Sequence, residues 1–309
     1  MILLQQMTIL FLIMLIGLIC RKRGLITDEG SSVLSKIVVN VSNPALILSA
    51  GMNKATVVEG RDLLTLAAVS LGMYVFLILI SWPFVRILRL KKHEYGTFRV
   101  MTVFSNIGFM GFPLISAVYG SEALLYASFF VIPYNVLIYT WGIALMKKGD
   151  KQGDGEREKL SFGKIFNIGV IACILTIILY LGRIRVPGFL ESTVSSLSAL
   201  TAPLSMIVIG DSLAKMKIRE LLTDKKILLF SLIKQLLIPV AGVFLLGLLG
   251  LDDRTRAVCM VMLATPVGSM TAMLAQQYDG EYDLASKGVA LTTLLSVATM
   301  PCVALITGL

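Results

Sequence analysis

The stretch SNIGFMGFPLISA, residues Ser105–Ala117, lies within a long apolar segment yet contains residues that break a helix. Asn106, Gly108, Gly111 and Pro113 follow one another closely in it. An interruption inside a lipid bilayer leaves backbone groups unpaired unless other protein segments or water satisfy them. Either this segment does not cross a membrane, or its break lines something useful.

The composition identifies an integral membrane protein. Of the 309 residues, 56% are hydrophobic and 15% are charged, whereas a soluble domain has about 25% charged residues. The longest polar segment, Lys147–Lys164, is a short linker and not a soluble domain. The net charge of +9 is explained by the topology below, so nucleic acid is not an expected partner.

Apolar runs long enough to cross a bilayer recur along the whole chain and predict ten membrane spans. With the N-terminus outside, 20 Lys and Arg residues fall in the inner connections and 6 in the outer ones. This asymmetry predicts both termini outside and the linker inside. The ten expected ranges are 3–20, 31–51, 63–85, 97–119, 122–146, 164–182, 192–213, 226–249, 255–277 and 284–306.

The two halves of the chain resemble each other. The second span contains SNPALILSAG and the seventh contains TAPLSMIVIG, so that Pro44 and Pro203, and likewise Gly51 and Gly210, lie 159 residues apart. The ninth span contains ATPVGSMTAML, a second helix-breaking run at the place that matches the break in the fourth. Because each half has five spans, the halves would insert in opposite orientations, a pattern found in secondary transporters. The expected units are a first repeat (1–146), a cytoplasmic linker (147–163) and a second, inverted repeat (164–309).

The broken helices offer a binding site for an anion. We expect the fourth span to restart at Phe112 or Pro113 and the ninth at Pro266 or Val267. Each restart leaves N–H groups without intrahelical partners and a partial positive charge at mid-membrane. Two such N-termini that meet would bind an anion without a charged side chain.

The candidate substrate-binding residues are those at the breaks, together with two amides in neighbouring spans. The alternative is that Gly and Pro only kink these helices or let them pack closely, and that the amides only join helices. The candidates are Asn106, Gly108, Gly111, Pro113, Thr265, Pro266, Gly268 and Ser269, with Asn43 and Asn135.

Two charged residues are candidates for ion coupling. Lys234 lies about eight residues inside the eighth span, where a cation faces a cavity or a partner, attracts an anion, or replaces a coupling ion; snorkelling to the interface is the alternative. Asp211 near the inner end of the seventh span would pair with a Lys, relay protons, or simply lie at a wetted helix end.

Enzymatic chemistry has no basis in the motifs. The single His93 lies in a basic loop, and neither a phosphate-binding loop nor a nucleophile elbow occurs. The four cysteines are scattered and have no metal-ligand spacing, so no metal and no cofactor is expected. Na⁺ or H⁺ remains a candidate coupling ion.

The ten spans, the basic loop, SNP in the second span, SNIGFMGFPL in the fourth and ATPVGSMTAMLAQQYDG in the ninth together resemble the auxin efflux carrier family. The family is similar to the bile-acid/sodium symporters, which pair a scaffold with a transport domain where two broken helices cross. The resemblance implies that spans 4 and 9 cross at Asn106, Pro113 and Pro266. It assigns spans 1, 2, 6 and 7 to a scaffold that forms a homodimer, and spans 3–5 and 8–10 to the transport unit.

The loop of about 17 residues departs from the plant exporters, which carry a longer hydrophilic loop, and favours a bacterial member. Such members are assigned to mono- or dicarboxylates such as malate or malonate. The hypothesis is thus an all-α secondary carrier of a small organic anion in the bacterial inner membrane, surrounded by membrane lipids. An aromatic-acid exporter, an ion channel and a ligand sensor are the rivals.

Overall fold

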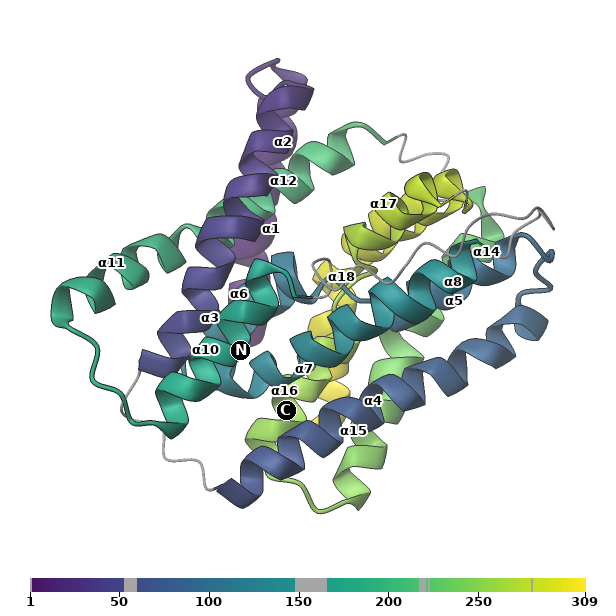
Figure 1. Ribbon diagram of the computed structural model, residues 1–309. Coiled ribbons are helices and arrows are strands. Elements are labelled where there is room, and N and C mark those ends of the chain that lie inside the picture. Colours follow the sequence, from purple (N-terminus) through teal and green to yellow (C-terminus); the bar gives the residue numbers. More distant parts are fainter. Residues whose placement is uncertain (1, 53–59, 148–165, 217–220, 222, 279) are drawn as a thin grey trace.

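The computed structural model describes residues 2–52, 60–147, 166–216, 221, 223–278 and 280–309, and these are almost entirely helical (Figure 1). Apart from Lys147, the expected linker 147–163 lies outside these ranges. Seven helical segments among them are long and apolar enough to cross a membrane. They are Leu4–Lys22, Asp28–Met52, Leu63–Phe84, Ala123–Met146, Gly188–Ala214, Lys225–Leu248 and Tyr282–Thr307.

The other three expected spans coincide with shorter helices. The sixth is α10 (Ile168–Leu181), whose first N–H groups bind the side chain of Asn167. The fourth and ninth are interrupted where the sequence predicts breaks. All ten expected ranges agree with the helix ends to within four residues. The interrupted spans consist of α5 (Glu94–Val103), η2 (Ile107–Gly111) and α6 (Phe112–Tyr119), and of α16 (Asp253–Ala264) and α17 (Ser269–Gln277).

Several long spans contain a π-type turn, which inserts one extra residue into the helix and changes which side chains face inward. The helices without a π turn that have not yet been given are α1 (Ile2–Lys22), α4 (Gly60–Ile87), α11 (Gly188–Ala199), α12 (Thr201–Ala214) and α18 (Tyr282–Thr307). Besides the fourth span with η2, three spans contain a π turn. They are α2 (Asp28–Ile37), η1 (Val38–Ser42) and α3 (Asn43–Met52); α7 (Ala123–Leu137), η3 (Ile138–Gly142) and α8 (Ile143–Met146); and α14 (Lys225–Leu232), η4 (Ile233–Leu237) and α15 (Ile238–Leu248).

Two helix pairs pack closely because a glycine lies at each contact. α12 packs along α1, and a Cβ at Gly210 would overlap the backbone carbonyl of Met14. α3 packs along α10, and a Cβ at Gly51 would lie 2.6 Å from the carbonyl oxygen of Thr176. These glycines are the two that recur 159 residues apart in the sequence, and both serve the same kind of contact.

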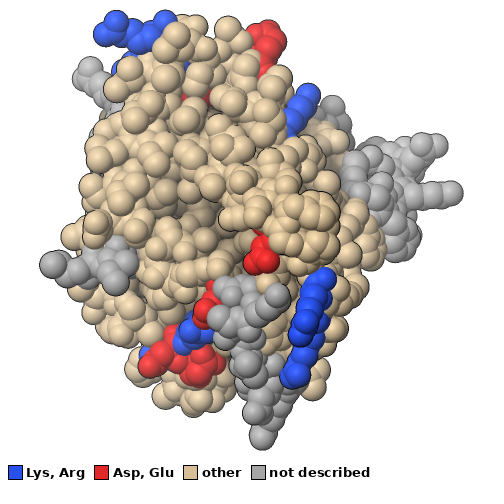
Figure 2. Space-filling model, turned by 90° about the vertical axis from the view of Figure 1, so that its left-hand side faces the viewer, with Lys and Arg blue, Asp and Glu red and all other residues tan. Residues whose placement is uncertain are grey.

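The outside of the molecule is apolar over a wide area. Large hydrophobic side chains are exposed along α1 and α4, among them Leu12, Ile16, Leu71 and Leu79. The face in Figure 2 has a broad area without Lys and Arg side chains, and Asp and Glu side chains lie near its centre and below it. An apolar surface this wide is covered by lipid in a membrane protein.

Candidate functional site

The two interrupted helices pair with each other at their breaks. Ser105 and Val267 form an isolated antiparallel bridge. The N–H of Asn106 donates to the carbonyl oxygen of Pro266 at 2.7 Å, and the N–H of Gly268 donates to that of Phe104 at 2.9 Å. Backbone groups freed by each break are thus satisfied by the other break, as burial in a membrane protein requires. We call this paired region, residues 104–106 and 265–268, the crossing.

Asn106 shapes the first break. α5 ends at Val103, and the helix restarts as η2, whose first turn is capped by the Asn106 side chain through a 3.3 Å bond from the N–H of Phe109. The α-helix α6 begins at Phe112, as expected, but the Asn106 cap already starts a helical π turn at Ile107, which the sequence does not predict. Pro113 is buried in the first turn of α6, directly after the π turn η2, so the N–H that proline lacks falls where the helix changes from π to α geometry.

The second break extends further than the sequence predicts. Thr265 ends α16 in an extended conformation, and its hydroxyl donates to the carbonyl of Met262 at 2.9 Å. The expected restart at Pro266 or Val267 is wrong, because the pairing with the first break keeps these residues extended. α17 begins at Ser269, which is exposed, after Gly268.

Glycines let other segments approach the breaks. A Cβ on Gly268 would lie 3.1 Å from the carbonyl oxygen of Ser105. A Cβ on Gly111 would contact the Thr265 methyl group at 3.6 Å, so this glycine faces the second break. Gly108 faces span 2, since its Cβ would lie 3.3 Å from the amide nitrogen of Asn43. Asn43 is thus brought next to the first break.

Lys234 reaches the crossing from η4. Its side chain is fully buried, and its ammonium donates to Ser105 Oγ at 2.8 Å and to the carbonyl oxygen of Leu263 at 3.1 Å. Snorkelling to the interface is therefore wrong for this residue. Within the described ranges, no carboxylate lies within 4 Å of the ammonium.

Two of the candidates make their contacts elsewhere. The Asn135 amide donates to the carbonyl of Val131 in its own helix and accepts from Asn167 at 2.5 Å, so it joins α7 to the start of α10. Asp211 is fully buried at the end of α12, where it accepts from Ser31 Oγ at 2.6 Å and pairs with two basic side chains. These are Arg21 at 3.6 Å and Lys215 at 3.2 Å.

Sequence reasoning missed four residues that build the crossing. Ser105 receives the lysine bond, and Tyr134 places its hydroxyl 3.2 Å from where a Gly268 Cβ would be. The side chain of Gln235 donates to the carbonyl of Thr292 at 2.6 Å, and Thr292 Oγ1 accepts from the N–H of Val267 at 3.0 Å. Ser105 could have been found from the sequence, because it stands next to Asn106 in the helix-breaking stretch. The other three residues reach the crossing only through contacts between distant parts of the chain.

The crossing combines opposite partial charges. The N-termini of η2 and α17 start at it, and the C-termini of α5 and α16 end at it. N-termini attract anions, and the negative C-terminal ends attract cations such as the lysine ammonium. Among the residues described, no group of three His, Cys, Asp or Glu side chains is placed to hold a metal ion. The N-terminal ends at the crossing are of the kind that bind small anions by electrostatic attraction.

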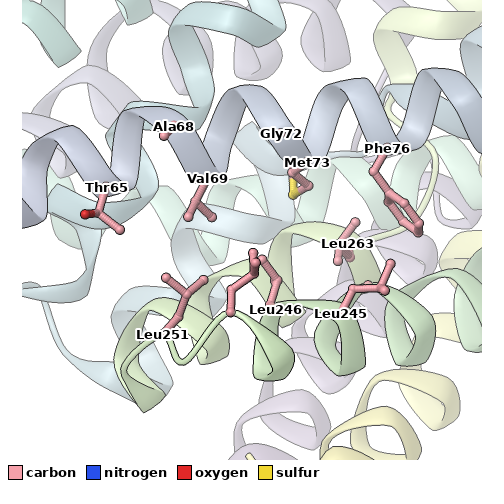
Figure 3. A pocket seen from close by; sticks show the side chains of 12 residues that line it. Thr65, Ala68, Val69, Gly72, Met73, Phe76, Leu245, Leu246, Leu251 and Leu263 are labelled. Carbon is pink, nitrogen blue, oxygen red and sulfur yellow. The ribbon is translucent and has the colours of Figure 1, made fainter.

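A separate cavity of about 430 Å³ lies between α4 and α15 (Figure 3). Its walls are apolar, with Val69, Met73 and Phe76 of α4 opposite Leu245 and Leu246 of α15. It touches the crossing region only through Leu263, whose side chain lines the cavity while its carbonyl binds Lys234. An apolar cavity of this kind does not suit a charged solute.

These features define a multi-pass helical membrane protein centred on two interrupted helices. The model of the family described as "Membrane transport protein" matches residues 2–304, so the chain belongs to this family of transporters, the auxin efflux carrier family that the motifs resemble. An uncharacterized transporter of Methanothermobacter thermautotrophicus is 24% identical over 289 residues, covering 94% of this chain and 93% of the relative. An uncharacterized transporter of Methanocaldococcus jannaschii is 23% identical over 297 residues, covering 94% of both.

Proposed function

We propose that this transporter is a secondary active carrier that moves a small organic anion, a mono- or dicarboxylate such as malate or malonate, across the cell membrane by alternating access. The observation that carries the proposal is the crossing: two helix N-termini start there, and the buried Lys234 ammonium has no carboxylate partner within the described residues. A buried cation without an opposite charge favours binding of an anion. The amides of Asn106 and Asn43 would orient the carboxylate.

We further propose ten membrane spans arranged as two inverted repeats, 1–146 and 164–309, with both termini outside. The support is the matching of contacts between halves: span 1 lies on span 7 through Gly210, and span 6 lies on span 2 through Gly51. Spans 1, 2, 6 and 7 would form the scaffold, and spans 3–5 and 8–10 the moving unit. The charge asymmetry of the connections supports the orientation.

The scaffold would form a homodimer through α11. No residue of Gly188–Ala199 is buried, and α11 lies at the left margin of Figure 1, away from α4 and α15. Its exposed face carries Ser192, Ser195 and Ser196, and small residues of this kind let membrane helices approach closely. Lipid acyl chains are the proposed occupants of the apolar cavity beside α4, whose neighbouring surface is apolar.

The test is uptake of labelled malate, malonate, succinate, lactate and indole-3-acetate into proteoliposomes under an imposed H⁺ or Na⁺ gradient. Saturable uptake of one acid supports the carrier, and the required gradient identifies the coupling ion. Asn106→Ala should lower uptake by about tenfold or more, the value of one charge-assisted hydrogen bond. Asn40→Ala is the matched control, because this exposed amide binds only the carbonyl of Lys36 in its own helix.

Background flux for every acid, in protein that is folded, would overturn the proposal. Uptake of indole-3-acetate alone would favour an aromatic-acid exporter. Flux without saturation or counterflow would favour a channel, and binding without flux would favour a ligand sensor.

A further inference from the structure

Lys234 lies where the negative ends of the broken helices converge. Leu263 belongs to the last turn of α16, and its carbonyl is among those that a helix end leaves without an intrahelical partner. Val261 and Met262 bind groups of Thr265 instead, so the lysine satisfies the next carbonyl in that turn. Ser105, the second acceptor, comes two residues after the end of α5.

Helix C-terminal ends and unwound carbonyls are the groups that bind Na⁺ in carriers with broken helices. Here the same kind of groups, the Leu263 carbonyl and the Ser105 hydroxyl, hold an ammonium that belongs to the chain. A second cation placed among them would lie within a few ångströms of this ammonium and be repelled by it. The position is therefore closed to a free ion while Lys234 is present.

The surroundings hold the lysine in this place. Lys234 lies in the π turn η4, and so does Gln235; both are fully buried. Gln235 binds the Thr292 carbonyl in α18, and Thr292 binds the N–H of Val267 in the crossing. Two adjacent side chains of one turn thus reach the crossing: Lys234 binds Ser105 directly, and Gln235 is linked to Val267 through Thr292 of α18. This double attachment positions the ammonium as part of the site.

We propose that the ammonium of Lys234 is a tethered substitute for a coupling cation, so that the crossing needs no Na⁺, and that its removal opens a site for a small monovalent cation. The part of this inference that concerns transport rests on the proposed function, and the part that concerns cation binding does not. If the crossing needs no Na⁺, a proton gradient or the gradient of the anion itself drives transport. The lysine acts as a positioning and charge-supplying residue.

Three proteins test this: the wild type, Lys234→Ala and Lys234→Met. The alanine variant removes both charge and side-chain stem and leaves room for an ion with water. The methionine variant removes the charge and refills the space. Each is purified and unfolded by heat in NaCl, in methylammonium chloride, or in N-methylglucamine chloride at equal ionic strength.

The wild type should unfold at the same temperature in all three salts. The alanine variant should gain stability in Na⁺ or methylammonium with a saturable concentration dependence, as expected for an ion that binds only the folded state. The methionine variant should gain none. In proteoliposomes, wild-type uptake should not respond to Na⁺, while one of the small cations should raise uptake by Lys234→Ala by at least about fivefold.

Saturable stabilisation of the wild type by Na⁺ would overturn the inference, and so would a folded alanine variant that ignores both small cations. If that variant folds only when purified with Na⁺ or methylammonium, the inference is supported; if neither cation recovers it, the inference fails. The thermal-unfolding measurement needs no substrate, so it tests cation binding even if no acid is transported. The two proposals therefore fail separately.

Discussion

The N–H of Asn106 and the carbonyl oxygen of Pro266, 160 residues apart in the sequence, lie 2.7 Å apart in a hydrogen bond between two buried residues. Proline lacks an N–H, so it cannot continue a regular helix at this point, but its carbonyl remains free to accept. Each break thus supplies a backbone hydrogen-bond partner for the other. The pairing explains how two helices can be interrupted in an apolar environment without leaving these backbone groups unpaired.

Gly268→Ala should impair the crossing more than it impairs the fold. Its Cβ would meet the Ser105 carbonyl at 3.1 Å and the Tyr134 hydroxyl at 3.2 Å, so the two breaks must move apart slightly. Overpacking of this size costs about 1 kcal/mol or more. Transport assays and thermal unfolding should show a large loss of uptake with a small loss of stability. Gly188→Ala, also at a helix start but with open space around its Cβ, should leave both unchanged.

Gly51→Ala and Gly210→Ala should destabilise the protein to a similar degree. In each case the added methyl group meets backbone of the neighbouring helix, which cannot rotate away. We expect a loss of about 1–3 kcal/mol for each, measured by thermal or denaturant unfolding. Gly72→Ala in α4 is the control, since nothing lies within 4 Å of its Cβ. If only one of the two substitutions is tolerated, the matching glycine contacts of the two halves do not contribute equally to the free energy of unfolding.

Asp211→Asn should lower stability without changing which anion is transported. The buried carboxylate binds Ser31 and pairs with Arg21 and Lys215, so its charge holds the ends of α1, α2 and α12 together. Loss of a charge-assisted bond of this kind costs about 2 kcal/mol. Thermal unfolding and the substrate panel would measure both effects. Asp28→Asn, an exposed member of the same network, should matter less. Intact stability with abolished proton-driven uptake would instead indicate a proton relay.

The ion pair between Glu94 and Lys226 should add stability that depends on pH. Burial raises the pKa of Glu94, but the N–H of Lys91 and the Lys226 ammonium outweigh this and hold it below its ordinary value of 4.5. A carboxyl with a lowered folded-state pKa stabilises above its unfolded pKa and loses that contribution as pH falls through the folded value.

The difference in unfolding temperature between wild type and Glu94→Gln should therefore be constant near neutral pH and shrink as the pH falls below 4.5. Glu191→Gln, at an exposed position of α11, is the matched control for removing a surface carboxylate and should leave the unfolding temperature at neutral pH nearly unchanged. A difference that persists at low pH would mean that packing, and not charge, ties α5 to α14.

Much of the fold could be predicted from the sequence because apolar length and charge act locally. Helices lie at all ten expected ranges, and both interruptions fall in or beside a stretch that contains Gly and Pro. Because a mid-span cation is costly in lipid, the sequence leaves two positions open for Lys234, one facing a cavity or partner and one at the membrane interface, and its ammonium lies at the first of these, bonded to Ser105.

Of the details that sequence reasoning missed, one is local and the others depend on contacts between distant residues. The helical turn at Ile107 is started by the Asn106 side chain, which caps the N–H of Phe109 three residues on, whereas the restart at Ser269 requires the preceding residues to pair with the other break. The bond between Asn135 and Asn167, the residue that caps α10, likewise joins positions 32 residues apart. No local pattern in the sequence predicts this bond or the pairing of the two breaks.

The reciprocal pairing of the breaks also sets an order for biosynthesis. α5, with 10 residues, covers about 15 Å of a hydrocarbon core about 30 Å thick, so it cannot cross on its own. When the ribosome has completed the fourth span, Pro266 and Gly268 have not yet been made, and the first break has no backbone partner from the second half. The first interrupted helix must therefore wait in a hydrated or protein-lined setting until synthesis passes the ninth span.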